Sequence, residues 1–90
     1  MSFEIISAAY CGDDNLAVIG FVDICGDAIE FERVVNKCGG FVSRRITETR
    51  FEISGDNFIS LLNKIGALTK MDSSYVTRLN YDIYNSLGRT

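Results

Sequence analysis

The chain of 90 residues contains no histidine, no tryptophan and no proline. Histidine is the commonest general base in enzymes and the commonest metal ligand, so its absence argues against catalysis and against a metal centre. The absence of proline favours regular elements joined by turns of Gly, Asn and Asp. No nucleophile and base can be paired from the remaining residues. We therefore expect a protein that is not an enzyme and has no cofactor.

The first 32 residues contain no lysine and no arginine. Their seven carboxylates give this stretch a charge of −7, whereas residues 33–52 carry +3 and the whole chain −3. An acidic segment of this kind argues against direct binding of nucleic acid and is compatible with a basic protein partner. Solubility alone is the alternative explanation of the charge.

A basic leader and a long apolar run are also absent. The opening residues, MSFEII, carry Glu4 early and no basic residue, which is untypical of a signal peptide. No apolar run approaches the ~18 residues that a membrane-spanning helix needs. Because hydrophobic residues make up 47% of the chain, we expect one folded domain over residues 1–90, soluble and cytoplasmic.

Runs rich in Val, Ile and Phe that end at glycine predict the strands. Gly26-Asp27 separates two such runs and predicts a two-residue hairpin of the II′ type. Turns at 12–15 and 37–40 bound the neighbouring runs. The expected strands cover residues 3–10, 16–24, 28–36 and 41–53 and form an antiparallel meander.

The three turns together predict a register that places one apolar face across all four strands. A shift of one residue would scatter this face. Its members are Phe3, Ile5, Val18, Val22, Ile24, Ile29, Phe31, Val35, Val42 and Ile46. Within residues 41–53 the apolar positions change from even to odd numbers. A bulge at 47–50 explains the change, and a separate short strand at 47–53 is the alternative.

Helical spacing of apolar residues follows in the last third of the chain. Asp56 is predicted to cap a helix that ends at Gly66, and Asp72 or Ser73 a second helix that ends at Gly88. Both helices are expected to cover the apolar sheet face. Their stripes are Phe58, Ile59, Leu61, Leu62 and Ile65, then Tyr75, Val76, Leu79, Ile83 and Leu87. The sequence thus predicts an α+β domain: a four-stranded antiparallel β-meander followed by two helices packed on one sheet face (ββββαα).

Three Cys-Gly pairs stand at the ends of the predicted strands: Cys11-Gly12, Cys25-Gly26 and Cys38-Gly39. The first and third pairs fall at the same end of the meander and the second at the opposite end. One metal site for all three thiols is therefore geometrically poor, and no C-x-x-C motif is present. A disulfide between Cys11 and Cys38 stays open, and free thiols are the default.

In the predicted register, Glu4, Asp23 and Glu30 lie side by side on the face opposite the core. Like charges that face one another destabilise a sheet, so a binding partner would explain such a row. Screening by water and salt is the alternative. Binding of Ca²⁺ or Mg²⁺ is less favoured, because carboxylates that project in parallel from a sheet do not enclose an ion. Glu32 is predicted to pair with Arg45 on the same face.

Apolar residues border the predicted acidic row. Ile6, Ile19, Phe21 and Val34 lie on the face that the two helices do not cover. An acidic patch beside exposed apolar residues is typical of a protein interface.

Two tyrosines, Tyr81 and Tyr84, fall outside the apolar stripe of the second predicted helix, and exposed tyrosine is enriched at interfaces. A tyrosine laid partly over neighbouring side chains is the commoner explanation. The expected partner-binding residues are Glu4, Ile19, Phe21, Asp23, Glu30, Glu32, Val34 and Tyr81.

These observations favour a small acidic inhibitor that binds a basic, nucleic-acid-handling protein such as a nuclease and blocks it by direct occlusion. Anti-CRISPR proteins and toxin-immunity proteins act in this way, and the step to them is one of analogy. The alternative is a structural or assembly subunit that forms a homodimer through the open sheet face.

Overall fold

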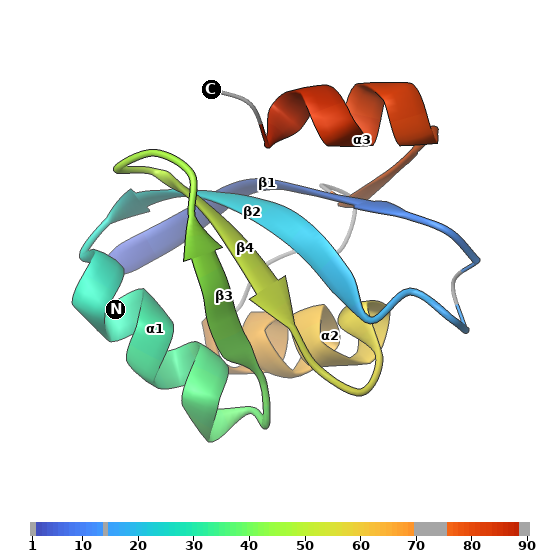
Figure 1. Cartoon of the computed structure of the whole chain (residues 1–90). Coiled ribbons are helices and arrows are strands. Elements are labelled where there is room, and N and C mark those ends of the chain that lie inside the picture. Colours follow the sequence, from blue (N-terminus) through green and yellow to red (C-terminus); the bar gives the residue numbers. More distant parts are fainter. Residues whose placement is uncertain (1, 14, 70–75, 89–90) are drawn as a thin grey trace.

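The computed structural model describes residues 2–13, 15–69 and 76–88, and within these ranges the chain forms a five-stranded sheet and three helices (Figure 1). The prediction of an α+β fold is confirmed. In chain order the elements are β1 (Phe3–Cys11), β2 (Ile19–Gly26), α1 (Ala28–Lys37), β3 (Phe41–Arg45), β4 (Arg50–Ser54), α2 (Phe58–Thr69), β5 (Val76–Leu79) and α3 (Tyr81–Leu87).

The sheet is mixed, and the expected four-stranded meander matches it only roughly. The strand order is β3-β4-β2-β1-β5, with β5 parallel to β1 and all other neighbours antiparallel. α1 and α2 cover one face, which we call the core face. α3 lies across the opposite face, which we call the outer face (Figure 1).

β1 begins where it was predicted and contains a bulge. Phe3 and Ile5 are buried on the core face, and the register shifts between Ile5 and Ser7. Because an extra residue reverses the face to which later side chains point, the buried positions then become Ala8 and Tyr10. The strand therefore supplies the core from odd and then from even positions.

Gly26-Asp27 is not a hairpin turn but the junction between β2 and α1. Gly26 has a φ of +113°, which glycine adopts without strain. The Asp27 carboxylate accepts hydrogen bonds from the backbone N–H groups of Ile29 at 2.9 Å and Glu30 at 3.2 Å. These bonds satisfy donors that the first helical turn leaves free. The hairpin prediction was wrong because aspartate after glycine suits a helix N-cap as well as a turn.

Residues 28–36, predicted as a strand, lie in α1. Apolar residues at Ile29, Phe31 and Val35 suggested a period of two. In the structure Phe31, Val34 and Val35 are buried, whereas Ile29 is 68% exposed. A helix places Val34 and Val35 against the sheet together, which no strand can do, so the helical period prevails.

Residues 41–53 supply two strands, β3 and β4. The loop between them is closed by the Thr47 hydroxyl, which accepts hydrogen bonds from the N–H groups of Thr49 and Arg50. The alternative of a separate short strand is thus the one found. A further irregularity lies in β3, between Val42 and Arg44.

α2 follows the predicted amphipathic pattern but differs at both ends. The side chain of Asn57, not that of Asp56, accepts a hydrogen bond from the Ser60 N–H at 2.9 Å. The helix continues through Gly66 to Thr69. A glycine inside a helix weakens it without ending it, so the predicted stop at Gly66 was wrong.

The second predicted helix divides into a strand and a shorter helix. Its expected caps, Asp72 and Ser73, lie outside the described residues, as does Tyr75. Residues 76–79 form β5, which pairs with Ala8–Cys11 of β1. The parallel pairing was missed because a strand of four residues carries little pattern of its own.

α3 begins after Asn80, whose side chain accepts a hydrogen bond from the Ile83 N–H at 2.9 Å. It ends at Gly88, as predicted. The helix packs on the outer face, so the prediction that both helices cover the core face was wrong.

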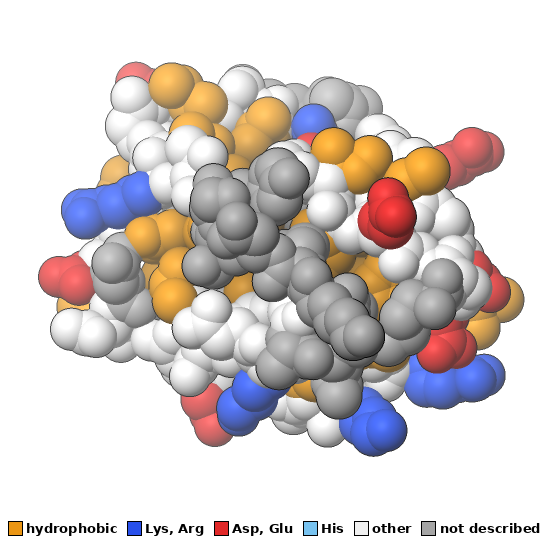
Figure 2. Space-filling model, turned by 180° about the vertical axis from the view of Figure 1, so that it is seen from behind, with side chains coloured by type: hydrophobic (Ala, Val, Ile, Leu, Met, Phe, Trp, Pro, Cys, Tyr) orange, Lys and Arg blue, Asp and Glu red, His pale blue; other side chains and the backbone are white. Residues whose placement is uncertain are grey.

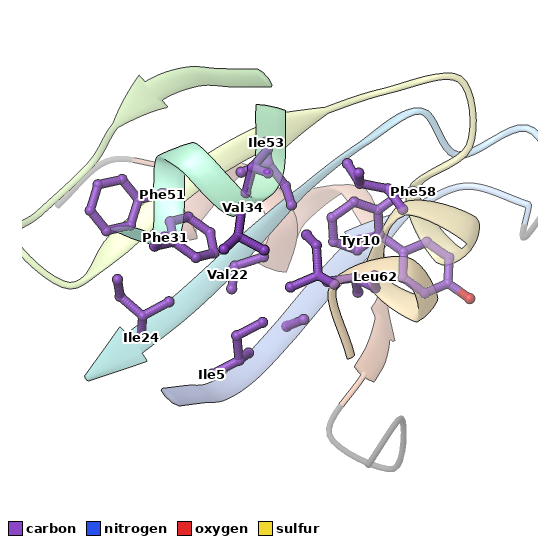
Figure 3. Close-up of a cluster of buried hydrophobic side chains, with 14 of the residues drawn as sticks. Ile5, Tyr10, Val22, Ile24, Phe31, Val34, Phe51, Ile53, Phe58 and Leu62 are labelled. Carbon is purple, nitrogen blue, oxygen red and sulfur yellow. The ribbon is translucent and has the colours of Figure 1, made fainter. Parts of the chain in front are cut away.

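The core lies between the sheet and the helices α1 and α2, where aromatic and branched side chains from both layers meet (Figure 3). Its most completely buried large members are Val22, Ile24, Phe31, Val35, Phe51, Ile53, Phe58 and Ile65. Val18, predicted in the core, is 47% exposed because β2 begins only after it. None of the helices within the described ranges is long and apolar enough to cross a membrane.

Candidate functional site

Asp23, the centre of the predicted acidic row, lies on the outer face of β2 and is paired within the fold. Arg50 on β4 donates from Nε to Asp23 Oδ1 at 2.8 Å, and the Ser7 hydroxyl donates to Oδ2 at 3.0 Å. Hydrogen bonds to a charged group are stronger than neutral ones. Asp23 therefore needs no binding partner to offset its charge.

The other members of the row lie elsewhere. Glu4 is exposed on β1, opposite Cys25. Glu30 lies in the first turn of α1, where its carboxylate is 3.3 Å from Arg33 Nη1. The row rested on the hairpin register, and the helix at residues 28–37 removes it.

The pairing of Glu32 with Arg45 is present, but it joins α1 to β3 rather than two strands. The charged atoms are 3.8 Å apart, and the Arg45 guanidinium lies over the ring of Phe51 at 5.4 Å from its centroid. Both charged side chains are about half exposed, so the ion pair contributes little to stability. Its role is to cover the edge of the core.

The predicted apolar patch is also dispersed. Ile6 is 55% exposed and Ile19 half-buried, but Phe21 and Val34 are buried. Val34 belongs to the core, whereas Phe21 lies on the outer face beneath α3. Tyr81, on α3, is 71% exposed, as its place outside the apolar stripe suggested.

Three exposed carboxylates come from segments that adjoin where β1 begins and β2 ends: Glu4, Asp27 and Glu48. Glu4 stands opposite Cys25, and the Asp27 N–H donates to the Ser2 carbonyl at 2.8 Å. Glu48 is in the loop between β3 and β4, which the bond from the Ile24 N–H to the Thr49 carbonyl holds against β2. We call this group the acidic end.

None of the three carboxylates forms an ion pair with a described residue. Two exposed isoleucines border the group, Ile6 on β1 and Ile29 in the first turn of α1. Figure 2 shows acidic and hydrophobic side chains on the right-hand side of the molecule, with Lys or Arg side chains at its lower right.

The sequence offered part of this site. Glu4 was recognised, and so was the acidic character of the first 32 residues. Glu48 was missed because it lies in the basic stretch 33–52. Only the packing of the loop at 46–49 against β2 brings it to the end of the sheet at which β1 begins.

A shallow hollow of about 270 Å³ lies on the outer face at the C-terminal end of α3. It is lined by Phe21, Arg44, Glu52, Tyr84, Asn85 and Gly88. Arg44 Nη2 is 3.2 Å from Glu52 Oε2, so the two opposite charges on its wall offset one another. The hollow falls below the ~300 Å³ at which small-molecule sites usually begin.

The three cysteines carry free thiols. Burial raises the pKa of the Cys38 thiol, and Lys64 and Lys37 offset this in part. A group of three or more Cys, Asp or Glu side chains placed to hold a metal ion does not occur in the described ranges.

Comparisons with family models, with curated proteins and with solved structures find no match for this chain. The fold and its surfaces define an α+β domain with one acidic end and one helix-covered outer face. Its function has to be inferred from those surfaces.

Proposed function

We propose that the protein is a non-enzymatic binding module that attaches to a basic protein surface through its acidic end. The observation that carries this proposal is that adjoining segments at one end of the sheet expose Glu4, Asp27 and Glu48, none in an ion pair with a described residue, together with Ile6 and Ile29. Glu4 and Glu48 are exposed and form no ion pair with a described residue, so a partner that supplies positive charge would give them ion pairs that the described part of the fold does not.

The two kinds of side chain serve different steps of association. Carboxylates attract a basic surface over distances of several ångströms and orient the encounter. Apolar side chains such as Ile6 and Ile29 then gain free energy when the contact excludes water. Interfaces commonly combine an apolar centre with a polar rim in this way.

Proteins that bind nucleic acid expose basic surfaces that neutralise phosphates. An acidic domain competes for such a surface, and we propose that this protein occludes it as a cytoplasmic inhibitor. Anti-CRISPR proteins and toxin-immunity proteins remain the closest functional analogy, and the partner is then a nuclease or another nucleic-acid-binding protein.

The alternative of a homodimer formed through the open sheet face has less support. α3 lies across that face and leaves only 3% of Phe21 exposed. The surface that was expected to mediate dimerisation is thus covered in part within one chain.

Charge reversal at the acidic end tests the proposal. The tagged chain is used to capture proteins from cells of its source, and each captured protein is purified. We expect a basic protein whose binding to nucleic acid is blocked by one equivalent of the wild-type chain. The double variant Glu4→Lys/Glu48→Lys should abolish capture and blocking, and added salt should weaken both.

The matched control is Asp56→Lys/Asp82→Lys, which changes the net charge equally at exposed positions away from the acidic end. It should bind like the wild type, and circular dichroism should show that both variants are folded. Equal loss of binding in both variants would mean that binding depends on net charge and not on the acidic end. Unchanged binding by the Glu4/Glu48 variant would refute a role for the acidic end.

A further inference from the structure

α3 rests on the outer face through few side chains. The ring of Tyr84 lies on that of Phe21, with the centroids 4.7 Å apart and the planes tilted by 39°. Leu87 is half-buried, and no residue of α3 is fully buried. A helix of seven residues is not stable by itself in water, so these contacts have to hold it.

One of these contacts is incomplete. The Tyr84 hydroxyl is buried and has no hydrogen-bond partner among the residues that the structure describes. Burial and the neighbouring Glu52 carboxylate raise the pKa of Tyr84 to about 12. The hydroxyl is therefore protonated at neutral pH and is a donor without an acceptor, which costs free energy that exposure to water would recover.

The hydrogen bond that Arg50 on β4 makes to α3 is weak. Arg50 Nη1 donates to the Leu87 carbonyl at 3.3 Å, while Nε of the same guanidinium bonds Asp23 at 2.8 Å. Release of α3 would leave the shorter bond intact. A shallow hollow of about 270 Å³ opens at the C-terminal end of α3, beside Tyr84 and Gly88.

We propose that α3 is a lid that lifts from the outer face while the rest of the domain stays folded, and that lifting exposes Phe21. The strand register places Ile19 and Phe41 on either side of Ser54 in the next row of the outer face. Lifting therefore joins buried Phe21 to half-buried Ile19 and exposed Phe41. This device lies on the outer face and is independent of the acidic end.

Amide hydrogen exchange of the full-length chain tests the lid. The reporters are the N–H groups of residues 84–87 in α3, and residues 61–65 in α2 serve as the reference. We expect the α3 amides to exchange at least about 100-fold faster than those of α2, because lifting requires no global unfolding.

Tyrosine variants separate lifting from simple fraying of a short helix. Tyr84→Phe keeps the ring on Phe21 and removes the unpartnered hydroxyl, so exchange in α3 should slow by about fivefold or more. Tyr84→Ala should accelerate it. The matched control is Tyr81→Phe, which deletes a hydroxyl from a side chain that is 71% exposed and should change nothing.

Protection of α3 equal to that of α2 in the wild-type chain would overturn the lid. So would an exchange rate in α3 that Tyr84→Phe leaves unchanged or raises, because the buried hydroxyl would then not oppose docking. Equal slowing by Tyr81→Phe and Tyr84→Phe would point to helix propensity and would also overturn it.

Discussion

α2 and α3 pack on opposite faces of the same sheet, and they differ in how much they bury. α2 places Phe58, Leu61, Leu62 and Ile65 in the core, each at most 4% exposed, whereas α3 buries no residue fully. Both helices begin with an asparagine whose side chain caps the first turn. An asparagine cap is therefore common to both helices, and they differ in the depth to which their side chains are buried.

Among the substitutions considered, truncation of Phe58 on α2 should cause the largest loss of stability. Phe58 is fully buried, and Phe58→Ala should lower the free energy of unfolding by about 3–5 kcal/mol. The measurement is urea unfolding followed by circular dichroism. Tyr84→Ala should lower it much less, and an equal loss would mean that α3 is as integral to the fold as α2.

A smaller effect is expected at Gly20, which underlies α2. A Cβ at this position would overlap the ring of Phe58 and lie 2.7 Å from the Ala9 carbonyl oxygen. Gly20→Ala should therefore destabilise the domain by about 1–3 kcal/mol. In the background of Phe58→Ala the cost should fall, since the ring is gone. Strict additivity of the two substitutions would contradict the contact.

Variants that remove the N-caps of α1 and α3 compare a helix on the core face with a helix on the outer face. Asp27→Ala removes the N-cap of α1 and should lower the free energy of unfolding by ~1 kcal/mol. Asp27→Asn should keep most of the stabilisation that the cap provides, because asparagine is also a good N-cap. Asn80→Ala removes the corresponding cap of α3. If α3 lifts before the domain unfolds, this variant should leave the global unfolding transition in place. A similar loss from both caps would contradict separate opening.

The smallest effect concerns alkaline pH. The pKa of Tyr84 is raised to about 12 from an ordinary value of 10, because docking of α3 favours the neutral phenol. Its contribution to stability is fully present below pH 10 and is lost as the pH rises towards 12. The stability of the wild type relative to Tyr84→Phe should thus decline over this window. A constant difference between the two would refute the raised pKa.

Much of the local structure could be predicted from the sequence. β1 is recognisable from its composition, and the stripe of Phe58, Leu61, Leu62 and Ile65 marks α2. Gly88 marks the end of α3. The region 28–36 was wrongly predicted as a strand, because its apolar positions fit a period of two nearly as well as one of 3.6. Asp27 did not resolve the choice, because an aspartate after glycine suits both a hairpin turn and a helix N-cap.

The candidate site was less predictable than the fold. Asp23 was expected to lack a partner, but Arg50, 27 residues away in the chain, pairs with it. Phe21 was expected on an open face, but Tyr84 covers it. Both outcomes depend on contacts between segments that are distant in the chain. One wrongly predicted turn, at Gly26-Asp27, was enough to misplace those segments.

The sequence by itself determined the fold class, the start of β1, the apolar stripe of α2 and the acidic character of the first 32 residues. These features depend on composition and on the spacing of apolar residues that are close together in the chain. Only the tertiary structure decided that β5 pairs in parallel with β1, that α3 covers the outer face, and that the segments carrying Glu4, Asp27 and Glu48 adjoin at one end of the sheet. Such placements depend on burial and pairing across long separations, which local pattern does not encode.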